Sequence, residues 1–336
     1  MPSKRRRTTQ IAPQLAPVQP QRGWLWWAIG TAALLVGLAV AAALVQRTGL
    51  SPAAPTAVAL RQPEPVTNCR SVPRFATAAG YSTVNFTTDD RTVMGLKMFD
   101  PAQPDKIYRH PSWANAGFLG PLIADGQGNL YVGPVPRINL IDNPPALQNR
   151  IYRVDTNTGE LKQLLELPAA APPAENPYGV LGITIDCETN SLYVSSVAGS
   201  DRNTERGRIY RIDLKTGQIA AQYDGVDAIG VGVYNTAHGK RLYYGPARVS
   251  EVRSLALDAQ GNFAGDERVE FQLNAPSASG IDRARRINFT DQSEMLINGR
   301  QFDYNLSATT VQPNLLYVFR YRTSDDGWDF VSFDPN

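Results

Sequence analysis

"RIYRVDTNTGEL", which occupies Arg150–Leu161, returns as "RIYRIDLKTGQI" at Arg208–Ile219, with seven of twelve paired positions identical. In each copy, arginine, isoleucine and tyrosine precede a polar turn, and a second short run follows it. β-Branched and aromatic residues next to such a turn are typical of a β-hairpin. The motif is therefore either a reactive element used twice or a structural unit that the chain repeats.

The turn residues of the motif favour the structural interpretation. Asp155 and Asp213 open the two turns, where a short carboxylate accepts backbone N–H groups. Gly159 and Gly217 close the turns, because glycine adopts positive φ at no steric cost. The strand residues expected to fill the space between neighbouring units are Ile151, Tyr152, Ile209 and Tyr210. We interpret the motif as a structural hairpin.

A second recurrence lies upstream of each hairpin. Its clear copies are "IADGQGNLYVG" (Ile123–Gly133), "ITIDCETNSLYVSS" (Ile183–Ser196) and "VYNTAHGKRLYYG" (Val233–Gly245). Weaker copies start at Val84 and Ile287. Each clear copy has a short apolar strand, a polar turn and a strand that contains Leu-Tyr. One unit thus contains two hairpins, which gives four antiparallel strands in about 40–55 residues.

This regular recurrence predicts an all-β fold. We expect a β-propeller with five visible four-stranded repeats, hence five or six blades, after an N-terminal transmembrane helix. The alternative fold is a β-sandwich, which does not explain the recurrence. The repeats begin near Tyr81, Gly120, Gly179, Gly230 and Gly280.

The first fifty residues predict a membrane anchor. Residues 24–45 are 22 residues without a charge, and a helix of that length spans about 33 Å, enough for a hydrocarbon core of about 30 Å. Lysine and arginine precede the span, so the N-terminus is expected in the cytoplasm. We expect a basic, proline-rich cytoplasmic tail over 1–23, the transmembrane helix over 24–45, a Pro/Ala-rich linker over 46–68, and an extracytoplasmic propeller over 69–336.

A cleaved signal peptide is the alternative to a permanent anchor. The small residues Ala57–Ala59 resemble a cleavage site. They lie well beyond the apolar run, which is itself longer than the usual 7–15 residues of a signal peptide. We therefore favour a signal anchor that is retained, with the propeller in a periplasm or at the cell surface.

Cysteine and histidine are scarce, with two of each in the whole chain. That scarcity excludes Cys/His zinc clusters. Cys69 and Cys187 both fall outside the membrane in the expected topology, where disulfides persist. A bond between them would raise the free energy of unfolding by on the order of 4 kcal/mol, because it closes a long loop in the unfolded chain. Two separate buried thiols are the alternative.

The segment "HGKRLYYGPARVSEVRSLALDAQGNFAGDERVEF" (His238–Phe271) resembles the propellers of the senescence marker protein/gluconolactonase family. "ADGQGNLYVG" is similar to the same family. The resemblance implies a six-bladed propeller and a lactonase that holds Ca²⁺ or another divalent cation on the propeller axis through Glu, Asn and Asp ligands. At the matching positions this chain has Leu119, Ile229 and Ser279, so we expect no metal and no cofactor.

Long loops between the second and third strands of the repeats mark a candidate binding face. Loops elaborated on one side of a rigid scaffold are where recognition is usually placed. The ten residues that we assign to this face are Arg137, Asp142, Asp201, Arg202, Glu205, Arg206, Arg248, Arg300, Asp303 and Tyr304.

These features together favour a binding module over an enzyme. No motif for nucleophilic, phosphoryl-transfer or zinc-protease chemistry is present, and a net charge of +2 gives no indication of nucleic-acid binding. We expect residues 24–45 to engage the membrane and the propeller to bind a protein, a glycan or a small ligand. A lactone or ester hydrolase with a rebuilt site is the alternative function.

Overall fold

The computed structural model describes residues 61–89, 92–136, 140–169, 175–273, 282–306 and 315–335. All of them belong to one compact unit, Leu60–Asn336. The tail, the expected transmembrane helix and most of the linker lie outside the described residues, as do Arg137 and Ser279. Within the described ranges, no helix is both long and apolar enough to cross a bilayer.

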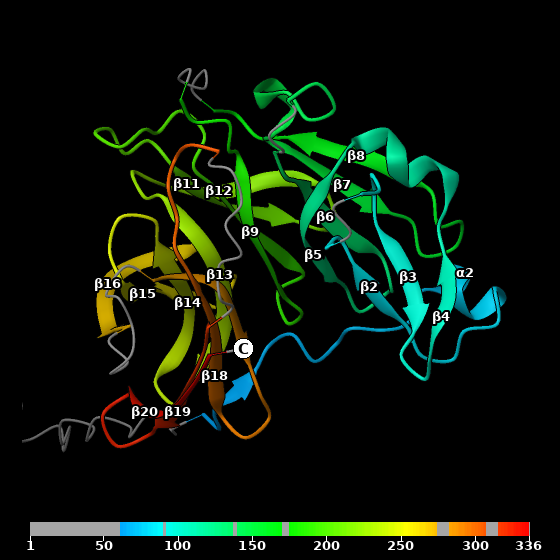
Figure 1. Cartoon of the computed structure of the whole chain (residues 1–336). Helices are drawn as coiled ribbons and strands as arrows, with labels where there is room; N and C mark the ends of the chain where they lie inside the picture. The colour runs from blue at the N-terminus through cyan, green and yellow to red at the C-terminus, as the bar shows by residue number, and fades with distance from the viewer. Residues whose placement is uncertain are drawn as a thin grey trace, which may run out of the picture. The chain divides into compact units, whose positions relative to one another are not determined.

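Five antiparallel sheets follow one another along this unit (Figure 1). The first holds β2 (Asn85–Thr87), β3 (Lys97–Asp100) and β4 (Gln103–Tyr108). The second holds β5 (Leu119–Ala124), β6 (Leu130–Pro134), β7 (Arg150–Val154) and β8 (Leu161–Glu166). The third holds β9 (Val180–Asp186), β10 (Ser191–Ser196), β11 (Arg208–Asp213) and β12 (Gln218–Asp224).

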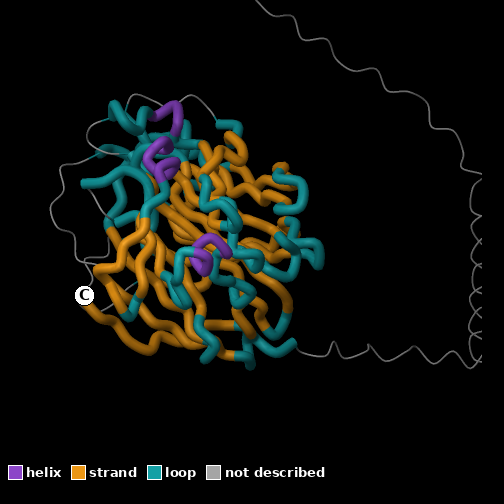
Figure 2. The backbone as a smooth tube through the Cα atoms, turned by 90° about the vertical axis from the view of Figure 1, so that its right-hand side faces the viewer, coloured by secondary structure: helices purple, strands orange, loops and turns teal. Residues whose placement is uncertain are grey.

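The last two sheets complete the series. The fourth holds β13 (Ala228–Thr236), β14 (Gly239–Pro246), β15 (Glu251–Leu257) and β16 (Phe263–Gln272), with β1 (Glu64–Pro65) added beside β13. The fifth holds β17 (Arg283–Phe289), β18 (Glu294–Arg300), β19 (Leu315–Arg322) and β20 (Gly327–Pro335). Within the described residues, helix is confined to α2 (Arg74–Ala78), η1 (Pro111–Ala116) and η2 (Pro145–Leu147), as Figure 2 shows.

This arrangement confirms an all-β, five-bladed propeller. The sheets match the five repeats in order and position, and the first strands β5, β9, β13 and β17 pack side by side. The first blade has three described strands instead of four. The expected linker also contains β1, in which Pro65 pairs with Tyr234, because an edge position tolerates the missing N–H of proline.

The repeated hairpin is structural, as the sequence indicates. Ile151, Tyr152, Ile209 and Tyr210 are all buried. The Asp155 carboxylate accepts the N–H groups of Asn157 and Thr158, and these bonds hold the pKa of Asp155 below its usual range. Gly159 and Gly217 have φ of 73° and 68°.

Residues 61–73, which we call the N-terminal strap, cross three blades at the end where the inner hairpins turn. Arg61 donates its N–H to Ala237 in the β13–β14 turn, Cys187 in the β9–β10 turn donates to Val66, and Ser71 donates to Asp125 in the β5–β6 turn. Figure 1 shows the strap in blue, running from β1 towards α2. The strap therefore joins the turn ends of the second, third and fourth blades.

A disulfide fixes the centre of this strap. The structure joins Cys69 to Cys187, which are 118 residues apart in the sequence. Nearby, the Lys240 ammonium is buried and lies 2.5 Å from Asp186 and 2.9 Å from Glu188. Glu188 also pairs with Arg61. Covalent and ionic links thus hold the strap to the third blade, which the Lys240 ion pairs join to the fourth.

Replacing both cysteines by serine should lower the free energy of unfolding by about 4–5 kcal/mol, because the disulfide closes a loop of more than a hundred residues in the unfolded chain. Urea unfolding of the full chain in detergent measures the change. Reductant should destabilise the parent protein to a similar extent and should leave the double variant unchanged. A parent protein that is insensitive to reductant would show that the strap stays in place without the bond.

Candidate functional site

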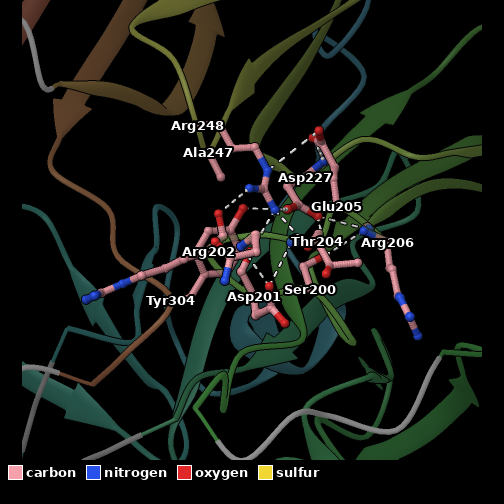
Figure 3. A network of polar contacts seen from close by, with 12 residues as sticks. Ser200, Asp201, Arg202, Thr204, Glu205, Arg206, Asp227, Ala247, Arg248 and Tyr304 are labelled. Atoms are coloured by element: carbon pink, nitrogen blue, oxygen red, sulfur yellow. Dashed lines mark hydrogen bonds and ion pairs between the residues drawn. The ribbon is translucent and has the colours of Figure 1, made fainter. Parts of the chain in front are cut away.

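The loop between β10 and β11, residues 197–207, is held closed by the guanidinium of Arg248 (Figure 3). Arg248 donates to the backbone carbonyls of Asp201 and Thr204, both at 2.7 Å, and of Arg202 at 2.8 Å. Its Nη2 also lies 3.1 Å from Asp227 Oδ2. This loop forms no strand pairing of its own. Arg248 therefore supplies hydrogen-bond donors to backbone carbonyls that would otherwise need other partners.

Asp227 is the buried carboxylate at the centre of this network. It lies just before β13 and is fully buried. Its Oδ1 accepts the hydroxyl of Ser200 at 2.5 Å and the N–H of Gly207 at 2.9 Å, and its Oδ2 accepts the hydroxyl of Tyr304. With Arg248 as its counter-ion, every lone-pair direction of the carboxylate has a donor, which a buried charge requires.

Tyr304 joins the third segment of the network, residues 300–306 that follow β18. Its ring lies 5.1 Å from the Arg248 guanidinium, a cation–π distance. Burial, together with the hydrogen bond to Asp227, raises the pKa of the Tyr304 hydroxyl. Phe302 packs edge-on against Tyr304 and at a tilt against Tyr178. The segment after β18 is thereby fixed to the third and fourth blades.

The exposed members of the predicted binding face are also engaged within the protein. Arg202 makes two bonds of 3.1 and 2.6 Å to Asp303, and these bonds lower the pKa of Asp303. Asp201 accepts the N–H groups of Asn203 and Thr204. Glu205 accepts the N–H of Asp227 at 2.8 Å.

The structure thus brings together Asp201, Arg202, Glu205, Arg248, Asp303 and Tyr304, and it uses their polar groups to hold loops in place. Arg206 belongs to the same loop, but its side chain extends away from the network (Figure 3). Asp142 is exposed on the separate loop before η2. Arg300 lies at the end of β18, and its side chain lines a cavity.

This cavity has a volume of about 580 Å³ and lies among the innermost strands of all five blades. Cavities that bind small molecules measure about 300–1,000 Å³. Thr67 and Arg70 of the strap line it at the turn end, and Arg300 lies at the opposite, loop-bearing end. We call it the axial cavity.

The axial cavity is rich in arginine. Arg70, Arg285, Arg286 and Arg300 contribute to its lining, whereas Asp89 is its one acidic lining residue in the described ranges. Arg285 is half-buried, and its Nη1 donates to the carbonyls of Leu181 and, at 2.8 Å, Ile229. Burial, and then the nearby charges of Arg286 and Arg300, lower the pKa of Arg285 to about 10, so that it remains charged at neutral pH.

Two of the three positions that the sequence resemblance aligns with lactonase metal ligands lie in the described residues. Leu119 and Ile229 are both buried apolar side chains, and Ile229 packs in a cluster with Leu181 and Tyr304. Across the described ranges, no three His, Cys, Asp or Glu residues are grouped as a metal site would need.

Sequence reasoning missed Asp227, Ser200 and Arg285. Asp227 offers one signal, since it is a lone carboxylate directly before an entirely buried strand. Arg285 offers another, because three arginines fall within four residues of β17 in "RARR". Neither signal identifies the partners, which lie on other blades.

Changing Asp227 to Asn should lower the free energy of unfolding by about 2–4 kcal/mol, because it removes the buried carboxylate that pairs with the partly buried Arg248 guanidinium. It should also speed proteolytic cleavage within residues 197–207. The matched control is Asp303→Asn, whose exposed pair is screened by solvent and should have little effect on stability. Equal effects of the two changes in urea unfolding and limited proteolysis would contradict a structural role for the network.

No family model matches this sequence, and no curated protein matches it. The narrower resemblance to the senescence marker protein/gluconolactonase family therefore stays a prediction.

Solved structures offer only distant similarity. One is the β-propeller domain of Cps50 (Swd1) from Myceliophteria thermophila, with 9% identity and a TM-score of 0.40 over 72% of this chain and 67% of that chain. Another, from Bacteroides fragilis, is described as a candidate 6-phosphogluconolactonase, with 10% identity and a TM-score of 0.44 over 72% of this chain. This chain covers 64% of that protein, less than two thirds of its length. Similarity at this level carries no functional argument, and the fold rests on the five sheets themselves.

Proposed function

We propose that this chain is a membrane-anchored, extracytoplasmic binding module that takes its ligand in the axial cavity from the loop-bearing end. The observation that carries the proposal is the cavity itself. It has the volume of a ligand site, and four arginines line it against a single acidic residue among the described residues. The ligand is a protein segment, a glycan or a small molecule.

The fixed loops at the same end of the propeller as Arg300 support binding. Arg248 and Asp227 hold residues 197–207 in one arrangement, and Tyr304 holds the segment after β18. A ligand that meets loops already fixed does not have to order them, so less binding free energy is lost. The network therefore prepares the site without needing to touch the ligand.

The proposed location rests on the sequence and is supported by the disulfide. The apolar residues 24–45 follow a basic tail, a pattern that places the propeller outside the cytoplasm. The Cys69–Cys187 bond suits an oxidising compartment. A lactonase remains the alternative, but Leu119 and Ile229 provide no oxygen ligands for its cation.

Thermal unfolding of the full chain in detergent, with a panel of glycans, organic acids, peptides and lactones, tests the proposal. We expect at least one ligand class to raise the melting temperature, since a ligand that binds only the folded state stabilises it by mass action. We expect no turnover of the lactones with or without added Ca²⁺. Metal-dependent lactone hydrolysis that is lost on chelation would establish the alternative.

Protease protection tests the orientation. In intact cells, or in spheroplasts if the source has an outer membrane, external protease should cleave within the expected linker over 46–68 and release the propeller. The cytoplasmic tail should stay protected under the same conditions. A propeller that becomes sensitive only after the inner membrane is lysed would reverse the proposed topology.

A further inference from the structure

A β-bulge places two consecutive arginines in the axial cavity. Neighbouring residues of a strand normally point to opposite faces of the sheet. In β17 the pairing with β18 passes from Ala284 to Arg286 and leaves Arg285 without a partner. A bulge of this kind re-aims side chains, and Arg285 and Arg286 both line the cavity.

The same irregularity occurs at the same level in two other blades. In β9 the pairing omits Leu181, and in β13 it omits Ile229. Arg285 donates its Nη1 to the carbonyls of these two bulged residues. One guanidinium therefore links three blades at the axis. Of the three bulged residues, Arg285 is charged, whereas Leu181 and Ile229 are apolar.

Arg285 keeps one edge available for a ligand. A guanidinium has five N–H donors in a planar fork, and the two bonds to Leu181 and Ile229 both use Nη1. Its Nε and Nη2 have no acceptor among the described residues. These two nitrogens form the edge that binds a carboxylate or phosphate group through two parallel hydrogen bonds.

The charge around this edge lacks compensation from the described protein. Arg300 has no carboxylate partner in the described ranges, and Arg286 Nη2 lies 3.8 Å from Asp89 Oδ1, beyond hydrogen-bond distance. Like charges that share a partly buried site repel one another, and a bound anion relieves the repulsion. A divalent cation would add to it.

The remaining walls suit a small molecule with an apolar body. Leu122, Ile183, Val231 and Ile287 present aliphatic side chains to the cavity. Thr88, Thr184 and Asn288 supply neutral polar groups. The walls therefore match the carbon skeleton and secondary polar groups of an organic acid.

We propose that the axial cavity binds a small organic anion with two or more negative charges, anchored by Arg285 and steered by Arg286 and Arg300. The ligand is a di- or tricarboxylate or a phosphate ester, which share clustered anionic oxygens. This inference rests on the proposed function, since it names the ligand class of the same cavity.

Calorimetric titration of the full chain in detergent with succinate, citrate and inorganic phosphate tests the inference. Succinamide, which has the shape of succinate without its charge, is the neutral control. We expect at least one anion to bind, more weakly at higher ionic strength, and we expect no binding of succinamide. Binding of phosphate alone assigns a phosphate ester, and binding of succinate or citrate alone assigns a polycarboxylate.

Three substitutions locate the site. Arg300→Gln should lower the affinity for the anion about tenfold or more, because it removes a charge-assisted hydrogen bond. Arg285→Gln should lower the affinity further. Asp89→Asn should strengthen binding, because it removes the acidic lining residue. The matched control is Arg320→Gln, which removes the same charge from an exposed ion pair with Glu294 on β18 and β19 and should change nothing.

The outcomes separate this inference from the proposed function. Equal binding of succinate and succinamide, no binding of the three anions, or no response to Arg300→Gln and Asp89→Asn would overturn the anionic ligand. A neutral compound from the wider panel that binds while the anions do not would leave the binding module intact. If Arg285→Gln fails to fold, the two exposed positions carry the test by themselves.

Discussion

Close approach of the inner strands at the propeller axis is the constraint on which the rest of the structure depends. On β13, a Cβ at Gly230 would lie 2.5 Å from the carbonyl oxygen of Ala284 in β17, and one at Gly232 would lie 2.8 Å from the carbonyl oxygen of Ile287 in β17. Only glycine fits at such distances, so the sheets converge where these residues stand. Convergence brings the bulges of three blades to one level. It is therefore what allows a single side chain, Arg285, to reach the carbonyls of Leu181 and Ile229.

The strap, at the start of the described domain, also contributes to the axial cavity. Val66 is buried against the core of the fourth blade, and Cys69 is bonded to the third. Thr67 and Arg70, between and beside them, line the axial cavity. A segment that leads from the expected anchor thus occupies the turn end of the cavity, which leaves the loop-bearing end for a ligand to enter. The disulfide stabilises the domain and, by its position, also shapes the site.

The fold could be predicted from the sequence because its signals are local and repeated. Asp155 and Gly159 define a hairpin turn through bonds within five residues, and the same turn recurs at Asp213. The candidate site could not be predicted in this way. Arg285 bonds to carbonyls 104 and 56 residues away, and its direction depends on a bulge, which no residue pattern in β17 indicates. Loop position correctly placed Arg248 and Tyr304 at one end of the propeller, but it could not show that Asp227 uses both internally.

The sign of the charge at the axis is what distinguishes this propeller from one that holds a cation. An axial Ca²⁺ site needs several oxygen ligands with net negative charge, and apolar Leu119 and Ile229 stand at two of the positions where the sequence resemblance would put such ligands. Arginine at a third bulge reverses the local potential. Most arginines of the outer strands have carboxylate partners, as Arg150 has Glu166 and Arg208 has Asp224. At the axis, Arg285 and Arg300 have no carboxylate partner among the described residues, and both line a cavity of ligand size. An anionic ligand explains this retained positive charge better than the stability of the fold does, because repulsion among these arginines opposes folding.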